Sequence, residues 1–129
     1  MGQARTRRGL TLDAGALIAL DRGVERVVAL VRGALNDGRR ITIPAGALAQ
    51  AWRGGPQQAR LAAFAGAATI DPLDEQAAKA AGVLCGRRGT ADVVDASVVI
   101  SARSRGDFVA TSDPDDLLSL DPLLRVRHI

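Results

Sequence analysis

The sequence predicts an α/β fold in which a parallel sheet of four to five strands is covered on both faces by helices. Short β-branched and apolar runs alternate along the chain with segments of helical periodicity. Such alternation favours parallel strands, because parallel neighbours need a crossover connection that is usually a helix. A length of 129 residues corresponds to one domain, which is large enough to bury a core without disulfides. We therefore expect a single domain over residues 1–129.

Five short segments have the composition of strands. Each is rich in valine, isoleucine, threonine or leucine, and residues that favour turns or helix starts follow, such as Asp71-Pro72 after the third. Residues 1–9 precede them as an arginine-bearing arm, which we expect to be flexible. In chain order the expected strands are residues 10–13, 41–43, 68–70, 108–111 and, at an edge of the sheet, 124–127.

The segments between these strands have helical periodicity and recognisable ends. Gly23 ends one helix, and Pro44 and Pro56 stand at first helical positions, where proline is tolerated. We expect Asp74 and Thr90 to cap the helices that follow them, with a basic loop at 86–89 between. The helix over 91–105 is apolar almost all round, which predicts burial against the sheet. In chain order the expected helices cover residues 14–20, 24–35, 44–53, 56–66, 75–85, 91–105 and 117–120.

The composition narrows the classes of protein to which the chain can belong. No apolar run approaches the roughly 18 residues of a membrane helix, and residues 1–12 lack the long apolar segment of a secretory signal. The simplest expectation is a cytoplasmic protein without a membrane partner. Cys85 is the only cysteine, which excludes an intrachain disulfide and a cysteine-based zinc site. We expect it to be a small buried side chain.

Arginine carries almost all of the positive charge. The net charge is +3, and Lys79 is the only lysine. Arginine binds phosphate through two parallel hydrogen bonds, so pairs such as Arg39-Arg40 and Arg87-Arg88 can bind a nucleic-acid backbone. A genome of high GC content would produce the same enrichment in alanine, glycine and arginine. Because no aromatic residues are interleaved with these pairs, the pattern favours polyanion binding only weakly.

Acidic residues recur where a parallel sheet gathers its ligands. Asp13 follows the first strand and Asp113 follows the fourth, and open α/β sheets bind ligands at the carboxyl ends of their strands. Asp92 and Asp95 are three residues apart, so both can lie on one face of the expected buried helix. Structural explanations exist as well. Asp13 can cap the helix that follows it, and Asp92 can stabilise a helix start through the helix dipole.

A divalent cation would explain why acids with apolar neighbours stand at these positions. An unpaired buried carboxylate is costly or is forced to take up a proton. Mg²⁺ and Mn²⁺ prefer oxygen ligands, and such ions lower the pKa of bound water and orient it for attack on a phosphodiester. The acids therefore indicate metal-dependent phosphodiester hydrolysis as a candidate chemistry.

Four motifs, in the same chain order, resemble the PIN-domain family and most closely its VapC-type toxins. The resemblance covers about residues 10–120. It implies a three-layer α/β/α PIN-like sandwich, a Mg²⁺- or Mn²⁺-dependent endoribonuclease that cleaves RNA, inhibition by a cognate VapB-type antitoxin, and a homodimer. The motifs are TLDAGALIAL from Thr11, Ile43-Pro44-Ala45 with Trp52-Arg53-Gly54, Asp92-Val93-Val94-Asp95-Ala96, and Thr111-Ser112-Asp113.

The resemblance assigns roles to individual acids. Asp13 matches the family's first metal-binding aspartate, Asp95 matches the aspartate of its central acidic helix, and Asp113 matches the acid of its Thr-x-Asp motif. Asp92, one turn before Asp95, can share the ligand role or take it over. These four are the expected metal ligands.

Other residues are expected around the acids. Thr111 or Ser112 can orient them through hydrogen bonds, and Asp116 is either a further acid of the site or a helix-start acid. Arginines are expected to hold the RNA backbone. The candidates are Arg53, Arg87 and Arg88.

Gln50 departs from the family pattern. Related toxins usually read Ala-Glu-x-Trp-Arg on the helix after the second strand, and this chain reads Ala49-Gln50-Ala51-Trp52-Arg53. An amide oxygen can ligate a metal, but it brings no charge and cannot act as a base, so metal affinity should fall. We expect Gln50 to be a catalytic-site residue beside the acids. The alternatives are that it faces solvent, or that the protein is a catalytically weakened PIN-fold module that binds antitoxin or RNA.

Two further hypotheses concern partners and fold. The helices over 14–20 and 24–35 can form a hydrophobic groove for an antitoxin segment, around Leu17 and Ile18, unless these side chains pack in the core. A phosphoryl-transfer protein of another doubly wound fold would need a lysine near the site. Lys79 lies on the alanine-rich helix, far in sequence from any strand end.

Overall fold

A parallel sheet of five strands forms the middle layer of the protein. The structure, a computed structural model, describes residues 8–129, so residues 1–7 of the expected arm lie outside it. The strands are β1 (Leu10–Leu12), β2 (Ile41–Pro44), β3 (Thr69–Asp71), β4 (Phe108–Thr111) and β5 (Val126–His128). Within the described range they lie in the order β3-β2-β1-β4-β5, and every neighbouring pair is parallel.

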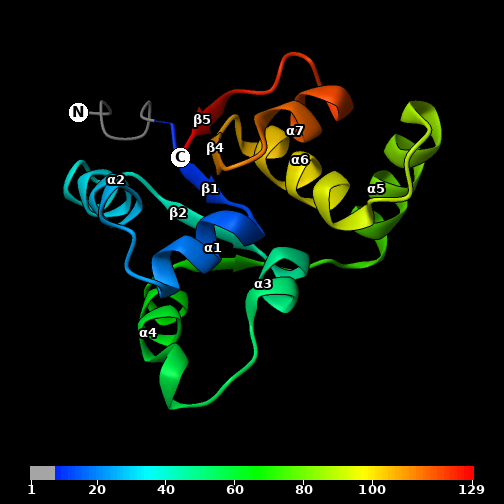
Figure 1. Ribbon diagram of the computed structural model, residues 1–129. Coiled ribbons are helices and arrows are strands. Elements are labelled where there is room, and N and C mark those ends of the chain that lie inside the picture. The colour runs from blue at the N-terminus through cyan, green and yellow to red at the C-terminus, as the bar shows by residue number, and fades with distance from the viewer. Residues whose placement is uncertain (1–7) are drawn as a thin grey trace.

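Helices cover both faces of this sheet. They are α1 (Ala14–Asp21), α2 (Glu25–Asn36), α3 (Ala45–Ala51), the 3₁₀ turn η2 (Pro56–Gln58), α4 (Ala59–Ala67), α5 (Glu75–Arg88), α6 (Val93–Arg105) and α7 (Pro114–Leu120). α1, α2 and α4 pack on one face, and α5, α6 and α7 pack on the other (Figure 1). α3 contacts both α1 and α6 at the end of β2. The three-layer α/β/α fold expected from the sequence is confirmed.

The largest boundary errors fall between α5 and α6. The expected basic loop at 86–89 is wrong, because α5 continues through Arg88 and ends at Gly89, whose φ of 70° is left-handed. Arginines have high helix propensity and their charge is favourable at a helix C-terminus, so they extend the helix. Thr90 is not the cap of α6. Asp92 is, and the Thr90 hydroxyl instead accepts the backbone N–H of Asp92 at 3.2 Å.

Smaller differences occur at other ends. Pro44 is the last residue of β2, and α3 starts one residue later than expected. α3 also ends at Ala51, before the expected residue 53, because Trp52 is already extended, with ψ of 130°. α7 begins at Pro114, ahead of the apolar residues from Leu117 that predicted it. Proline at the first helical position explains that earlier start.

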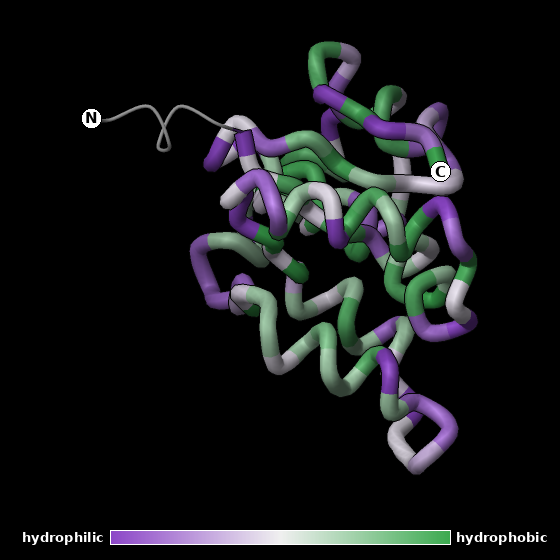
Figure 2. The backbone as a smooth tube through the Cα atoms, turned by 90° about the vertical axis from the view of Figure 1, so that its left-hand side faces the viewer, coloured by the Kyte–Doolittle hydropathy of each residue, from purple (hydrophilic) through white to green (hydrophobic). Residues whose placement is uncertain are grey.

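The core is aliphatic. Its fully buried side chains come from the sheet and from the helices on both faces, for example Leu12 on β1, Leu17 on α1 and Val98 on α6. Cys85 is buried, as expected. The all-round burial expected of α6 holds for its middle turns but is wrong for Val93 in its first turn, which is exposed. Hydrophilic residues gather in several of the connections between elements (Figure 2).

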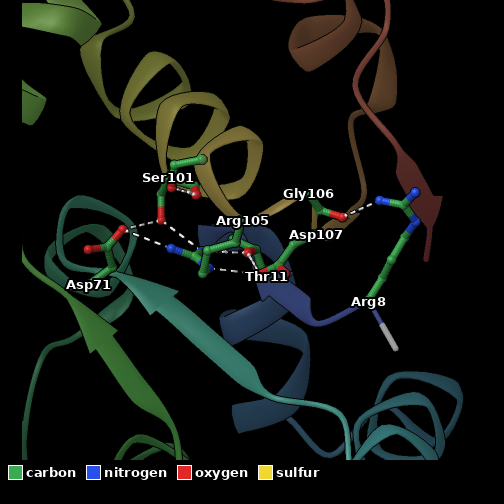
Figure 3. Close-up of polar contacts among 8 residues, drawn as sticks. Arg8, Thr11, Asp71, Ser101, Arg105, Gly106 and Asp107 are labelled. Atoms are coloured by element: carbon green, nitrogen blue, oxygen red, sulfur yellow. Dashed lines mark hydrogen bonds and ion pairs between the residues drawn. The ribbon is translucent and has the colours of Figure 1, made fainter. Parts of the chain in front are cut away.

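Arg105, in the last turn of α6, ties that helix to three strands (Figure 3). Its Nε donates to Asp107 Oδ2 at 3.0 Å, and its Nη1 donates to Asp71 Oδ2 at 3.1 Å. Its Nη2 donates to the hydroxyls of Thr11 and Ser101, both at 3.0 Å. Thr11 lies on β1, Asp71 ends β3 and Asp107 precedes β4. The network therefore fixes one end of α6 across the sheet.

The described part of the expected arm is hydrogen-bonded to the domain. Arg8 Nη1 donates to the carbonyl oxygen of Gly106 at 2.9 Å, and the carbonyl oxygen of Gly9 accepts the N–H of Phe108 at 3.0 Å. Gly9 is buried, and a Cβ built on it would stand 2.7 Å from Asp107 Oδ1. Arg8 and Gly9 are thus held against the start of β4. None of the helices within residues 8–129 is both long and apolar enough to cross a membrane.

Candidate functional site

β1 delivers Asp13 to the carboxyl end of the sheet. The strand ends at Leu12, and the next side chain, Asp13, is only 8% exposed. Its Oδ1 accepts the backbone N–H of Ala16 at 2.9 Å, so Asp13 is the N-cap of α1. The capping interpretation is therefore correct, and it does not exclude a site role, because a carboxylate has further lone pairs to offer.

Thr111 links Asp13 to Asp113. β4 pairs with β1 in a register that sets Leu12 beside Ala110, so the two strand ends lie side by side. The buried Thr111 hydroxyl accepts the backbone N–H of Asp113 at 2.9 Å and hydrogen-bonds with the Asp13 carboxylate. Asp113 is exposed, and its side chain makes no capping bond to α7. One hydroxyl thus contacts the Asp13 carboxylate and the backbone of Asp113.

Ser112 lies over the start of α1. A Cβ built on Gly15 would stand 2.7 Å from Ser112 Oγ and 3.5 Å from Asp13 Oδ1. Only glycine leaves room for Ser112 at this distance without a shift. Gly15 was not among the expected site residues, although a glycine in the first turn after a strand-end aspartate is a sequence signal for a close approach.

The first turn of α6 carries a second pair of acids. Asp92 is the N-cap of the helix, and its Oδ1 accepts the backbone N–H of Asp95 at 3.0 Å. Burial is the main cause that raises the pKa of Asp95 to about 7, followed by the hydrogen bond and charge of Asp92 and by the charges of Asp116 and Asp13. The interactions that shift Asp95 are thus with acids from three different elements.

Burial also raises the pKa of Asp13. Hydrogen bonds from Thr111 and from the backbone of Ala16 oppose this shift, while the charge of Asp113 adds to it. The charge of Asp113 helps to raise the pKa of Asp13, and the charge of Asp13 helps to raise the pKa of Asp95. The two pairs of acids therefore form one electrostatic unit. We refer to this unit as the carboxylate cluster: Asp13, Asp92, Asp95, Asp113 and Asp116.

The carboxylate cluster has the oxygen donors of a divalent-cation site, but its side chains do not point at one common position. Within residues 8–129, no three carboxylate, imidazole or thiol groups stand in an arrangement that could hold a metal ion. All donors of the cluster are oxygens, which Mg²⁺ and Mn²⁺ prefer. The positive charge of a cation would also favour the ionised form of Asp95, against the burial and the mutual repulsion that raise its pKa. The residues therefore fit such an ion, provided that their side chains rotate toward it.

The remaining predicted site residues lie around the cluster on exposed surfaces. Gln50 is exposed near the end of α3, and its side chain makes no hydrogen bond within the described chain. Arg53 follows α3 and donates from Nη1 to the carbonyl oxygen of Trp52 at 2.7 Å. Arg87 and Arg88 are exposed at the end of α5, a few residues before Asp92. The structure does not bring Gln50 or these arginines into contact with the acids.

The raised pKa of Asp95 predicts how stability depends on pH. Its value rises from 3.8 to about 7 in the folded protein. Between these values the folded state binds more protons than the unfolded chain, so the free energy of unfolding should fall as the pH rises through this window. Asp95→Asn should flatten the dependence and stabilise the protein most at neutral pH. Urea unfolding at about pH 5 and about pH 7.5 measures the effect. An equal pH dependence in wild type and variant would contradict it.

Comparison with known proteins identifies the fold. No family model and no curated protein matches the sequence. A chain of DNA-bound VapBC from Salmonella typhimurium matches with a TM-score of 0.68 and 22% identity, over 95% of this chain and 98% of that one. VapBC2 from Rickettsia felis, bound to a promoter DNA fragment, matches with 0.68 and 11% identity, over 93% and 98%. FitAcB from Neisseria gonorrhoeae matches with 0.61 and 20% identity, over 91% and 95%.

These likenesses extend over nearly the whole described domain. Because the sequence identities are low, they establish the fold and not the role of individual residues. TM-scores of 0.61 to 0.68 over more than 90% of both chains show a shared overall fold. The chain therefore has the fold that its resemblance to PIN-domain, VapC-type toxins predicted.

Proposed function

We propose that the protein is a Mg²⁺- or Mn²⁺-dependent endoribonuclease and the toxin of a VapBC-type toxin-antitoxin module. The observation that carries the proposal is the carboxylate cluster, which joins the ends of β1 and β4 to the start of α6; burial, together with the neighbouring acids, raises the pKa of Asp95 there to about 7. The likeness to chains of VapBC and FitAB complexes supports it at the level of fold. The proposal places the protein in the cytoplasm, where its RNA substrate would be found.

The chain's own residues would divide the work between metal and substrate. Asp13, Asp95 and Asp113, with help from Asp92, would hold the ion. Thr111 would keep the Asp13 carboxylate oriented and would hold the backbone of Asp113 through the hydrogen bonds it already makes. When bound, the ion would lower the pKa of a water molecule and orient it toward the RNA phosphodiester. Arginines would hold the RNA backbone, and their candidates are Arg53, Arg87 and Arg88.

An antitoxin is the proposed protein partner, because the matched structures are VapBC and FitAB complexes. The groove expected between the first two helices is only partly available. Leu17 is fully buried, which is the core packing considered as the alternative, whereas Ile18 is 36% exposed. A hollow of about 560 Å³ beside α2 adds both apolar and charged surface for an antitoxin helix, because Val28 and Arg32 are among its lining residues. Homodimerisation remains part of the proposal.

A metal titration of wild type and Gln50→Glu tests the function. The proposal expects residue 50, where related toxins usually carry glutamate, to face the ion across a short gap, so the added carboxylate should lower the Mg²⁺ or Mn²⁺ needed for half-maximal RNA cleavage by about tenfold. Gln76→Glu, on the exposed first turn of α5, adds the same charge elsewhere and serves as the control. RNA cleavage that needs no divalent ion in either protein would overturn the proposal.

A catalytically weakened binding module is the second candidate function. It is motivated by Gln50, whose neutral, exposed side chain stands where related toxins usually carry glutamate. The same titration separates the two functions. If Gln50→Glu leaves cleavage undetectable while RNA or antitoxin still binds, the binding module is correct. A gain of cleavage in Gln50→Glu supports the nuclease.

A further inference from the structure

The loop after α3 is held in one conformation by a single side chain. Gln58, in η2, accepts the backbone N–H groups of Arg53 at 2.7 Å and of Gly54 at 2.8 Å through its Oε1. Its Nε2 donates to the carbonyl oxygen of Ala51 at 3.0 Å. These three hydrogen bonds satisfy backbone groups that the end of α3 would otherwise leave without partners. Gln58 therefore fixes the backbone from which the Trp52 and Arg53 side chains project.

Trp52 is the side chain that this loop presents to solvent. It is the only tryptophan of the protein and is 41% exposed. Gly54 and Gly55 follow it with positive φ values of 79° and 91°, and Gly54 lies beside the ring, since a Cβ built on it would stand 3.8 Å from Trp52 Nε1. An exposed aromatic ring is costly to leave in water, and its flat face suits stacking against another ring.

The sequence on either side of Trp52 carries charge of one sign. Residues 38–70 include four arginines and no acidic residue. Arg53, next to Trp52, forms no ion pair within the described chain, and one of its nitrogens donates to the carbonyl oxygen of Trp52. An aromatic face beside an unneutralised guanidinium matches a base and its phosphate, the combination with which proteins bind single-stranded nucleic acid. An apolar peptide would use the ring but not the charge.

Trp52 lies one short helix away from the carboxylate cluster. α3 begins beside α6, where a Cβ built on Gly46 would stand 3.1 Å from Ser97 Oγ, two residues after Asp95. Seven helical residues then lead to Trp52. At a rise of about 1.5 Å per residue, α3 spans roughly 10 Å. An RNA strand that crosses the cluster can therefore reach Trp52.

We propose that Trp52 stacks on an unpaired base of the RNA substrate, that Arg53 binds the adjacent phosphate, and that Gln58 positions both. The inference rests on the proposed nuclease function for its substrate class. It adds a recognition element outside the carboxylate cluster, which selects single-stranded RNA, because a base inside a duplex has no free face for the ring.

The single tryptophan makes the proposal directly measurable. The protein contains no tyrosine, so its fluorescence reports on Trp52 alone. Titration with a single-stranded RNA oligonucleotide, with EDTA present to prevent cleavage, should quench this fluorescence, and the same RNA as a duplex should quench it far less. Trp52→Ala should weaken RNA binding, measured by anisotropy of a labelled oligonucleotide, by about tenfold. Arg53→Ala should weaken it and reduce its salt dependence.

Two controls isolate the loop. Arg125→Ala removes the same charge just before β5, at the sheet edge opposite β3, and should leave binding nearly unchanged. Gln58→Ala should reduce both quenching and affinity at a temperature where circular dichroism shows the domain still folded. Gln58→Glu keeps the acceptor for both N–H groups and should retain more of the quenching. A purely structural role for Gln58 would lower the melting temperature and leave the affinity of the folded domain unchanged.

The outcomes separate this proposal from the proposed function. Cleavage of RNA without quenching of Trp52 would overturn the stacking platform and leave the nuclease standing. Quenching by single-stranded RNA without metal-dependent cleavage would support the platform and overturn the nuclease. If Trp52 responds to protein concentration or to an antitoxin and not to RNA, the loop is a protein interface and the proposal is wrong.

Discussion

Asp13→Asn is expected to abolish RNA cleavage while leaving α1 intact. The asparagine amide oxygen can still accept the N–H of Ala16, which Asp13 Oδ1 accepts at 2.9 Å, so the helix cap survives. The negative charge at the buried end of β1 is lost, and with it the proposed metal ligand. We expect the cleavage rate at saturating Mg²⁺ to fall by about 100-fold or more. Initial rates on a labelled RNA, with circular dichroism as a check of folding, measure the effect.

Asp13→Ala separates chemistry from capping. This variant removes both the charge and the acceptor for Ala16, so it should lose the same activity and also about 1 kcal/mol of stability. Asp13→Asn should show little of that second loss. If the asparagine variant cleaves RNA at the wild-type rate, Asp13 is a helix cap and nothing more.

Arg105→Met is expected to cause the largest loss of stability among single changes at the sheet surface. Asp107 is only 5% exposed, and it would keep the Thr11 hydroxyl but lose its positive partner. Asp71 would lose its ion pair as well. Breaking a buried ion pair by removing one partner typically costs about 3–5 kcal/mol, because the remaining charge stays buried. Urea unfolding of the two proteins gives the difference in the free energy of unfolding.

Arg103→Met is the matched control on the same helix. The Arg103 side chain is 50% exposed and lies 3.6 Å from Asp121, a surface pair whose loss should cost less than about 1 kcal/mol. Adding Asp107→Asn to Arg105→Met should recover part of the stability, since the unpaired charge is removed. Equal losses in Arg103→Met and Arg105→Met would show that the network contributes no more than a surface pair.

The sequence predicted the fold because the fold depends on patterns that are local. Each strand and helix is marked by composition, periodicity or proline, and their alternation leaves few arrangements. The errors at 86–89 and Thr90 arose where two signals competed: arginines that favour a helix stood beside a glycine, and two side chains, Thr90 and Asp92, could both cap α6. Which one wins depends on the packing of α5 against α6, and no local pattern records that.

The site divides in the same way. Asp13 and Asp113 could be placed together at the carboxyl ends of the strands, because each stands at or just after the end of a predicted strand. The hydrogen bond of Thr111 with the Asp13 carboxylate, and the approach of Ser112 to Gly15, depend on contacts between β4 and the start of α1. The Arg105 network joins residues that are 94 and 34 positions apart in sequence. Contacts of this kind follow from the register of the sheet and cannot be read from neighbouring residues.

The order of the strands determines where in the fold the strand-end acids meet. From β1 the chain moves outward to β2 and β3, and from β4 it moves outward the other way to β5, so the direction of winding reverses between β1 and β4. The helices that follow these two strands, α1 and α7, therefore depart to opposite faces. Open α/β sheets bind ligands at such a reversal, and Asp13 and Asp113 follow the two strands concerned. Chains that match this fold with a TM-score of 0.68 share only 11% and 22% of its residues, so the arrangement of strands depends little on most individual side chains.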